Sequence, residues 1–175
     1  MTATTDDPGT DQTRLAAVVP GYVLDHDDPA ALFTRLQRVV MHLETLQTES
    51  MQDFDITFGD FVILATLRKE PAPHELPVSR LAEYILRPMG SITQAVDRVE
   101  QSGLVQRSPD AQDRRKVLVA LTEAGCRFAD EALLAYDDIR RRVLKRLTDD
   151  EQRSIDAAVT RLLEALEADH WENHA

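Results

Sequence analysis

Apolar residues recur at helical spacing over much of this chain. Near the N-terminus they are separated by steps of 4, 3, 4 and 3 residues, at Leu32, Leu36, Val39, Leu43 and Leu46. This spacing predicts a helix with one apolar face, which suits either a core-facing helix or a seam between two chains. Asp28 as a cap, with Pro29 at the first helical position, is a typical start signal for that helix.

The C-terminal part shows the same kind of periodicity. Thr122 followed by Glu123 predicts the start of a long helix that ends near residue 146. Thr148 and Glu151 match the Ser/Thr-x-x-Asp/Glu pattern of a capping box and predict the start of the last helix. The apolar stripe of that helix has steps of 4, 3 and 4 residues, at Ile155, Val159, Leu162 and Leu166.

Three shorter helices are predicted between these stretches. The first begins after Thr57 and ends at Pro71, with an apolar face made of Phe58, Phe61, Val62, Ala65 and Leu67. A compact helical unit covers 78–86, and the Pro-Met-Gly sequence at 88–90 separates it from a helix over 90–101. Gly103 is placed as the stop signal of that helix. Its inner face is predicted to consist of Ile92, Ala95, Val96 and Val99.

The hydrophobic period changes after Gly103. Residues 104–107 and 116–121 are short runs with branched apolar side chains, and a polar, charged stretch over 108–115 separates them. Such runs are typical of strands, so the pattern predicts a β-hairpin with a long charged loop. Residues 71–77 carry no comparable signal and are expected to be a simple link.

Composition narrows the class of protein. The 175 residues are 43% hydrophobic and 29% charged, which is typical of a globular chain. No stretch approaches the roughly 20 apolar residues of a membrane-spanning helix, and the acidic N-terminus lacks the pattern of a secretory signal. We therefore expect a cytoplasmic protein that does not enter a membrane. Cys126 is the only cysteine, which excludes an intrachain disulfide and a cysteine-rich zinc site.

The net charge of −11 hides a gradient along the chain. Residues 79–116 hold seven basic and five acidic residues and so carry +2, which leaves −13 for the rest. Residues 1–30 carry −5 and residues 148–175 carry −6. A neutral-to-basic segment between acidic ends indicates that only the middle of the chain is suited to a polyanionic partner.

Helix, tight turn, helix and charged hairpin within about 45 residues is the order of a winged helix-turn-helix. In that arrangement the second helix enters the major groove of DNA, where side chains reach base edges. Arginine in the hairpin loop suits the narrow minor groove, where the potential is most negative. The outward positions of the 90–101 helix hold groups that bond bases or phosphates: Ser91, Thr93, Gln94, Asp97, Arg98 and Gln101.

The run from Ser91 to Gly125 resembles the MarR family of bacterial transcriptional regulators. The matching features are the Asp97-Arg98 pair, the Gly-Leu-Val at 103–105, the Asp-x-x-Asp-Arg-Arg at 110–115 and the Leu-Thr-Glu-Ala-Gly at 121–125. The segments 56–67 and 78–86 resemble the two helices that precede these features in the family. The resemblance covers about residues 30–168 and implies a DNA-binding regulator, most often a repressor, and not an enzyme.

Residue roles follow from the resemblance by position. It implies DNA contacts by Ser79, Arg80, Ser91, Thr93, Gln94, Arg98, Arg114, Arg115 and Lys116. Family members often have arginine where this chain has Gln94, and an amide suits contacts with adenine. Arg114 is expected at the tip of the wing. We expect Asp113 and Arg115 to pair and hold the shape of the wing.

The resemblance also implies a homodimer that binds a pseudo-palindromic DNA site and is released by a phenolic or carboxylate effector. In the family the effector pocket lies between the first, second and fifth helices. For this chain that prediction points to Arg38, His42, Phe58 and Phe61. His42 fits either a hydrogen bond to an anion or phenol, or a half-buried place in a subunit interface.

These features predict a mainly α fold, a winged helix-turn-helix with a small β-hairpin wing and flanking dimerisation helices. Residues 1–29 form an acidic extension that is partly disordered, with a possible short helix over 13–19. Residues 30–56 and 122–170 form the helical dimerisation region. Residues 57–121 form the DNA-binding domain.

Other functions are less consistent with the sequence. An enzyme would need a nucleophile–base pattern, a glycine-rich phosphate loop or a metal cluster, and we find none of these and expect no cofactor. A winged-helix module that binds only proteins is the alternative, although it does not explain the basic residues of the wing. Cys126 suits either packing or a redox role. His170 and His174 share a helix face and, with Glu167, have the residue types of a zinc site, but their place in a fraying tail argues against a metal role.

Overall fold

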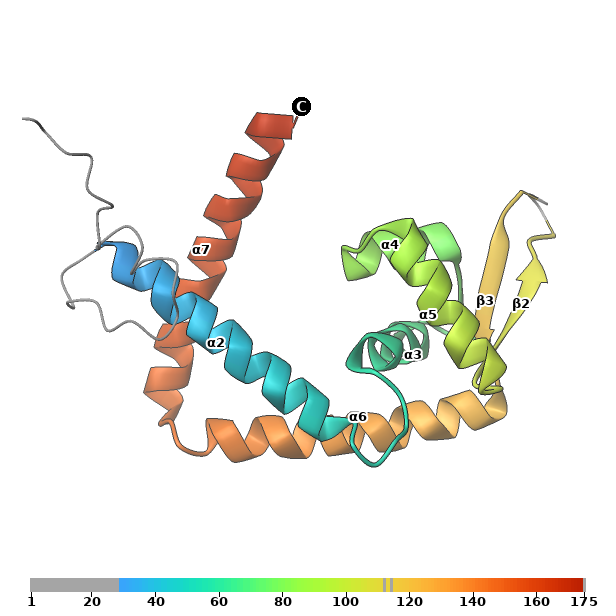
Figure 1. Ribbon diagram of the computed structural model, residues 1–175, viewed down its shortest axis with the longest axis horizontal. Helices are drawn as coiled ribbons and strands as arrows, with labels where there is room; N and C mark the ends of the chain where they lie inside the picture. Colours follow the sequence, from blue (N-terminus) through green and yellow to red (C-terminus); the bar gives the residue numbers. More distant parts are fainter. Residues whose placement is uncertain (1–28, 112, 114, 175) are drawn as a thin grey trace, which may run out of the picture. The chain divides into compact units, whose positions relative to one another are not determined.

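The computed structural model describes the backbone of residues 29–111, 113 and 115–174 and the side chains of residues 31–111, 113 and 115–168 (Figure 1). The chain divides into two compact units, residues 1–58 and 59–175. The predicted acidic extension, its helix over 13–19 and the cap at Asp28 lie outside the described residues. The same holds for Arg114 and for the side chains of His170 and His174.

The first unit contains α2 (Pro29–Ser50), which confirms the predicted N-terminal helix. Its apolar stripe is largely exposed to solvent, because Leu32, Val39 and Leu43 each expose about half of their surface. Phe33, Val40 and Met41 are exposed to a similar extent. The apolar surface of α2 is therefore wider than the predicted stripe.

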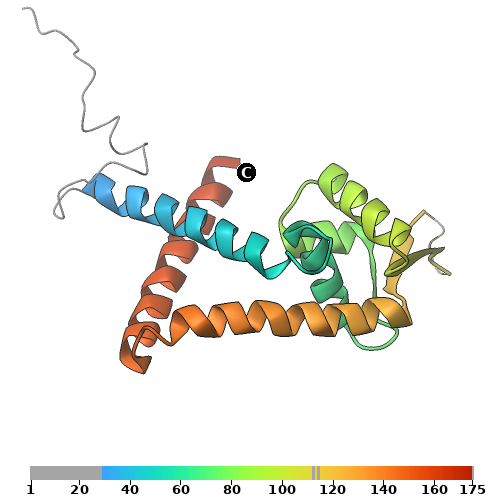
Figure 2. The same cartoon turned by 60° about the horizontal axis from the view of Figure 1, so that its bottom comes forward.

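Apart from the short strand over 75–77, which was not predicted, the remaining elements follow one another as the pattern predicts. They are α3 (Phe58–Lys69), β1 (Glu75–Pro77), α4 (Val78–Ile85), α5 (Met89–Gln101), β2 (Val105–Pro109), β3 (Val117–Leu121), α6 (Glu123–Leu144) and α7 (Asp149–His174). The mainly α fold class with a small sheet is confirmed. Figures 1 and 2 show β2 and β3 as a hairpin beside α5.

The sheet has three strands, so the predicted two-stranded hairpin is incomplete. β3 is central, with β2 and β1 antiparallel on its two sides. Val105 faces Leu121 in one pair, and Glu75 faces Ala120 in the other. β1 was missed because three residues, one of them proline, give no alternation to detect. Proline is tolerated there because β1 is an edge strand.

The core of the second unit lies between the helices and the sheet. The four residues predicted for the inner face of α5 are all buried: Ile92, Ala95, Val96 and Val99. The prediction for α3 is partly wrong, because Ile63 and Leu64 are fully buried while Val62 and Ala65 are only half-buried. Packing covers α3 on more than one side, so its sequence does not show a single apolar stripe.

The end of α5 and the start of α6 meet at a close backbone contact. Gly103 has φ +72°, and hydrogen bonds from Gly103 N to Glu100 O and from Leu104 N to Val99 O close α5 in a Schellman motif. The Thr122 hydroxyl donates to Gly103 O at 2.8 Å and accepts from Gly125 N at 2.9 Å, which caps α6. A Cβ on Gly125 would lie 1.9 Å from Leu104 O, so only glycine fits there.

A capping box starts α7, as predicted. Glu151 accepts from the Thr148 N–H at 2.8 Å, and the Thr148 Oγ1 accepts from the Glu151 N–H at 3.3 Å. The Glu151 carboxylate accepts from the Thr148 backbone N–H and from the Thr148 hydroxyl, and these two hydrogen bonds lower the pKa of the carboxyl below its ordinary value. Ile155, Val159 and Leu166, three residues of the predicted stripe, expose about half of their surface. Within the described part of the chain, none of the helices has the length and apolar character needed to cross a bilayer.

Candidate nucleic-acid interface

The outward face of α5 carries the polar side chains that the sequence predicts there. Ser91, Thr93, Gln94 and Arg98 are exposed, whereas Asp97 is half-buried. The Thr93 hydroxyl donates to the carbonyl of Met89 at 2.9 Å, so its hydrogen is already used within the helix. The Gln94 amide makes no hydrogen bond within the described residues. α5 therefore offers an amide and hydroxyl groups to a ligand that meets this face.

Arg98 joins α5 to α3. Its Nη2 donates to Asp60 Oδ1 at 2.6 Å, and its Nε lies 3.1 and 3.2 Å from the two carboxylate oxygens. The Asp60 side chain is only 4% exposed, while that of Arg98 is 51% exposed. Hydrogen bonding to Asp60 raises the pKa of the Arg98 guanidinium. Arg98 thus holds α5, the predicted recognition helix, in place, and the predicted DNA contact of Arg98 stays a prediction.

Arg107 of β2 joins the wing to α5. Its guanidinium lies 2.6 Å from Asp97 and 2.5 Å from Glu100, and its N–H donates to Glu100 at 3.1 Å. Burial of Arg107 opposes its charge, but the hydrogen bonds to the two carboxylates outweigh this effect and raise its pKa. The sequence analysis counted Arg107 only as a basic residue, because no local spacing links it to a helix on the other side of Gly103.

The start of α4 contributes two of the predicted DNA-binding residues. Ser79 and Arg80 are both exposed in the first turn of this helix. Arg80 donates to Glu83 at 2.6 Å and to the Tyr84 hydroxyl at 3.0 Å, and its guanidinium lies over the Tyr84 ring. These bonds raise the pKa of Arg80, with the hydrogen bond to Tyr84 as the largest cause. The guanidinium stays at the surface, where a phosphate can reach it.

Asp113 makes hydrogen bonds with the backbone of the two residues that precede β3. Its carboxylate accepts from the Arg115 N–H at 3.1 Å, and its carbonyl accepts from the Lys116 N–H at 2.8 Å. Lys116 Nζ lies 3.9 Å from the same carboxylate. The predicted pairing of Asp113 with Arg115 therefore runs through the backbone of Arg115 rather than through its side chain. The side chains of Arg115 and Lys116 are exposed.

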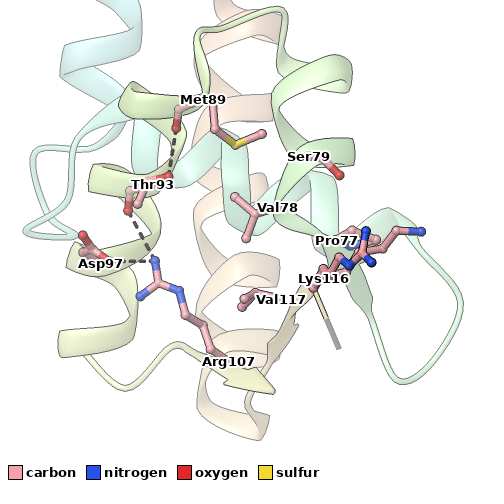
Figure 3. A pocket seen from close by; sticks show the side chains of 10 residues that line it. Pro77, Val78, Ser79, Met89, Thr93, Asp97, Arg107, Lys116 and Val117 are labelled. Atoms are coloured by element: carbon pink, nitrogen blue, oxygen red, sulfur yellow. Dashed lines mark hydrogen bonds and ion pairs between the residues drawn. The ribbon is translucent and has the colours of Figure 1, made fainter. Parts of the chain in front are cut away.

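A groove of about 520 Å³ separates the recognition helix from the wing (Figure 3). Met89, Thr93 and Asp97 line its α5 side, while Lys116 and Val117 lie on the wing. It brings together Ser79, Thr93, Arg115 and Lys116, four of the predicted DNA-binding residues. The sequence analysis did not single out Met89, because it placed this residue in the break before the helix at 90–101, whereas Met89 is the first residue of α5.

The residues predicted for an effector pocket are divided between the two units. Arg38 and His42 are exposed on α2, and Phe58 is half-buried at the end of the first unit. Phe61 is 2% exposed and packs edge-to-face on Tyr136 of α6, with ring centroids 5.7 Å apart. Phe61 is therefore a core residue of the second unit, and its contact with an effector stays a prediction. Cys126 is half-buried in the first turns of α6.

The fold and this surface define a winged helix-turn-helix protein, and comparisons with known proteins identify its family. Residues 56–117 match the model of the MarR family. The transcriptional repressor MdtR of Bacillus subtilis is 30% identical over 138 residues, which cover 79% of this chain and 87% of MdtR. The chain belongs to the MarR family.

Solved structures agree with this assignment. A mutant of MarR from Escherichia coli in complex with operator DNA has a TM-score of 0.68 at 25% identity and covers 80% of this chain and 99% of that one. AbsC, a MarR family regulator from Streptomyces coelicolor, has a TM-score of 0.72 at 23% identity, and the match covers 83% of this chain and 98% of the AbsC chain. This match shows a similar fold. The family comprises DNA-binding transcriptional regulators and not enzymes.

Proposed function

We propose that this protein is a homodimeric, cytoplasmic repressor that binds a pseudo-palindromic promoter site and leaves it when a small phenolic or carboxylate effector binds. The observation that carries the DNA-binding part is the surface around α5. There, exposed polar side chains of the recognition helix lie beside a groove whose opposite side holds Arg115 and Lys116. Bases are read by such a helix in the major groove, and phosphates are bound by the cations around it.

The relatives support this function. A MarR structure was solved with operator DNA, and MdtR is described as a repressor. Covering a promoter with two winged domains is sufficient to repress, because the polymerase then has no access to the same DNA. Ser79, Arg80, Ser91, Thr93, Gln94, Arg98, Arg114, Arg115 and Lys116 are the proposed DNA contacts.

The apolar faces of α2 and α7 support the homodimer. Leu32, Val39 and Leu43 on α2 are about half exposed, and so are Ile155 and Val159 on α7. On each helix, exposed apolar side chains at helical spacing are typical of a face that binds another protein surface. A two-fold dimer places two recognition helices about 34–36 Å apart, one turn of DNA, and so reads an inverted repeat.

Effector release would be a shift between two forms of the dimer. In one form the recognition helices match the spacing of the DNA site, and in the other they do not. A ligand that binds the second form more tightly lowers the affinity of the dimer for DNA. The size of this effect is limited by the ratio of the ligand's affinities for the two forms. His42 and Arg38 supply a hydrogen-bonding group and a positive charge for an anionic or phenolic ligand, and Phe58 and Phe61 supply aromatic surface.

The first experiment measures binding to a labelled duplex from the promoter of the protein's own gene, by fluorescence anisotropy over a series of salt concentrations. We expect affinity to fall steeply with salt, because binding releases counterions from the phosphates. Arg115→Ala in both subunits should reduce the slope of log affinity against log salt by about 2, one per charge. Arg153→Ala on α7 is the matched control and should leave the slope unchanged. Failure to bind any duplex at low salt would overturn the proposal.

Two further measurements test the dimer and the effector. The mass in solution should be twice 19.7 kDa, and Val159→Glu should lower it to that of one chain. Benzoate and phenol are the probes for release: each is titrated into the protein–DNA complex, with His42→Ala alongside. Saturable binding of a probe with no change in DNA affinity contradicts the release mechanism.

A further inference from the structure

Several large apolar side chains near the start of the recognition helix and on the wing are exposed to water. Leu86 is 86% exposed, Met89 is 46% exposed and Val117 of the wing is 43% exposed. Met89 is the first residue of α5, and Figure 3 shows its side chain at the edge of the groove, on the same helix as Thr93. Exposure of a methionine at this place is unfavourable in the free protein.

The polar groups around Met89 are mostly engaged within the protein. The Thr93 hydroxyl donates to the Met89 carbonyl, and the Asp97 carboxylate binds Arg107. The hydrogen-bonding hydroxyl of Thr93 is therefore not available as a donor to a base. What this part of α5 presents to a ligand is the thioether chain of Met89 and the Ser91 hydroxyl, with the Gln94 amide on the next turn.

The surroundings of Met89 identify the chemistry of the occupant. The groove is lined by apolar side chains at Met89, Val78 and Val117, by the mutually neutralising pair of Asp97 and Arg107, and by the cations Arg115 and Lys116 on the wing. A ligand that matches both the apolar side chains and the cations is apolar at its centre and negatively charged along its edge. A thymine in the major groove has these properties, because its C5 methyl group points into the groove and phosphates flank it.

We propose that Met89 is a specificity-determining residue that contacts the methyl group of a thymine in each half-site. This inference rests on the proposed function, since it requires α5 to lie in the major groove. Residues at the N-terminal end of a recognition helix are those that contact base edges. Met89 reads the methyl group and Gln94 bonds an adenine, so the half-site contains A·T pairs at the positions that the start of α5 reaches.

The experiment replaces thymine by uracil, which removes only the methyl group. The preferred duplex is first selected from a random library with the full-length protein, and each thymine of one half-site is then replaced in turn. At one position we expect affinity to fall about fourfold, the ratio that corresponds to one buried methylene-sized group. Replacement in both half-sites should lower affinity about fifteenfold.

Two variants separate the role of Met89 from effects of uracil on DNA shape. Met89→Ala should bind the thymine and uracil duplexes equally, because it has no side chain to reach the methyl group. Leu86→Ala is the matched control: it removes an exposed apolar side chain from the turn before α5, outside the groove, and should keep the wild-type ratio. Met89→Gln keeps the length of the side chain. It replaces Met89→Ala in the comparison of thymine and uracil duplexes if Met89→Ala changes the circular dichroism spectrum.

The outcomes distinguish this inference from the proposed function. If wild-type protein selects a duplex but binds its uracil forms equally well, the inference is wrong and the DNA-binding function stands. It is also wrong if Met89→Ala keeps the full preference for thymine, since shape alone then explains it. If no duplex is selected at low salt, the proposed function fails and this inference fails with it.

Discussion

Arg98 Nη2 lies 2.6 Å from Asp60 Oδ1, and this ion pair joins the recognition helix to α3 across 38 residues of sequence. The two partners differ in environment, because the Asp60 side chain is 4% exposed and that of Arg98 is 51% exposed. A charged partner offsets the cost of taking a carboxylate out of water, and Arg98 is one such partner of Asp60. The position of α5 therefore depends on Arg98 irrespective of any contact with DNA.

Removal of Arg98 should destabilise the fold. We expect Arg98→Ala to lower the free energy of unfolding by about 2 kcal/mol, the usual cost of breaking a charged hydrogen bond to a buried group. Arg80→Ala is the control, because it breaks an exposed ion pair with Glu83 and should lower the free energy of unfolding far less. Urea denaturation measures both. Equal losses of unfolding free energy in the two variants would show that the Arg98–Asp60 pair stabilises the fold no more than an exposed ion pair does.

The same variant tests how Arg98 acts on DNA. If Arg98 only positions α5, Arg98→Ala should weaken binding to all duplexes by the same factor, and Asp60→Asn should reproduce the effect. If Arg98 also contacts a base, Arg98→Ala should weaken the preferred duplex more than a scrambled one. Anisotropy titrations with the two duplexes distinguish these roles.

Arg107 should couple the wing to the recognition helix. Arg107→Ala removes the partner of both Asp97 and Glu100 and leaves two unneutralised carboxylates on the helix that we propose enters DNA. We expect a loss of stability of roughly 1–3 kcal/mol and weaker DNA binding, with the largest effect on binding at low salt. Arg107→Lys should restore little of the lost stability and DNA affinity, because an ammonium cannot bind two carboxylates in the geometry of a guanidinium. Full rescue by lysine would contradict this account.

Gly125 should not accept any side chain. Its Cβ would lie 1.9 Å from Leu104 O, and the clashing atom is backbone that cannot rotate away. We expect Gly125→Ala to cost about 3 kcal/mol or more, at the upper end of overpacking effects. Gly90→Ala is the matched control, because no atom lies within 4 Å of its Cβ position and alanine favours the helix by up to about 1 kcal/mol. Thermal unfolding of the two variants should therefore shift in opposite directions.

The capping box of α7 should give a pH-dependent helix start. The pKa of Glu151 is lowered because its carboxylate accepts hydrogen bonds from the backbone and hydroxyl of Thr148. A lowered pKa in the folded state means that the cap stabilises the helix above the ordinary glutamate pKa and that this stability is lost as pH falls through the folded value. A ¹³C titration of the Glu151 carboxyl should show the low pKa, and Thr148→Ala should raise it. An unchanged pKa in that variant would disprove the contribution of the cap.

The sequence predicted the helices and the candidate DNA-binding face because these depend on local signals. Thr122, Gly103 and the Thr148–Glu151 box act within one turn of the chain, so their neighbours in sequence suffice to place each helix boundary. The inner face of α5 follows from the 3.6-residue period, and the outward face with Gln94 and Arg98 follows as its complement.

The tertiary structure decided what those outward residues do within the protein and which residues support them. The Asp60–Arg98 and Arg107–Asp97 pairs join residues 38 and 10 positions apart, on elements whose packing no local period encodes. The strand β1 exists only because β3 has a free edge to pair with, and the exposure of Met89 depends on how α5 meets the wing. Local backbone preferences depend on neighbouring residues in the sequence. Charge pairing, burial and strand pairing arise only when distant segments pack together.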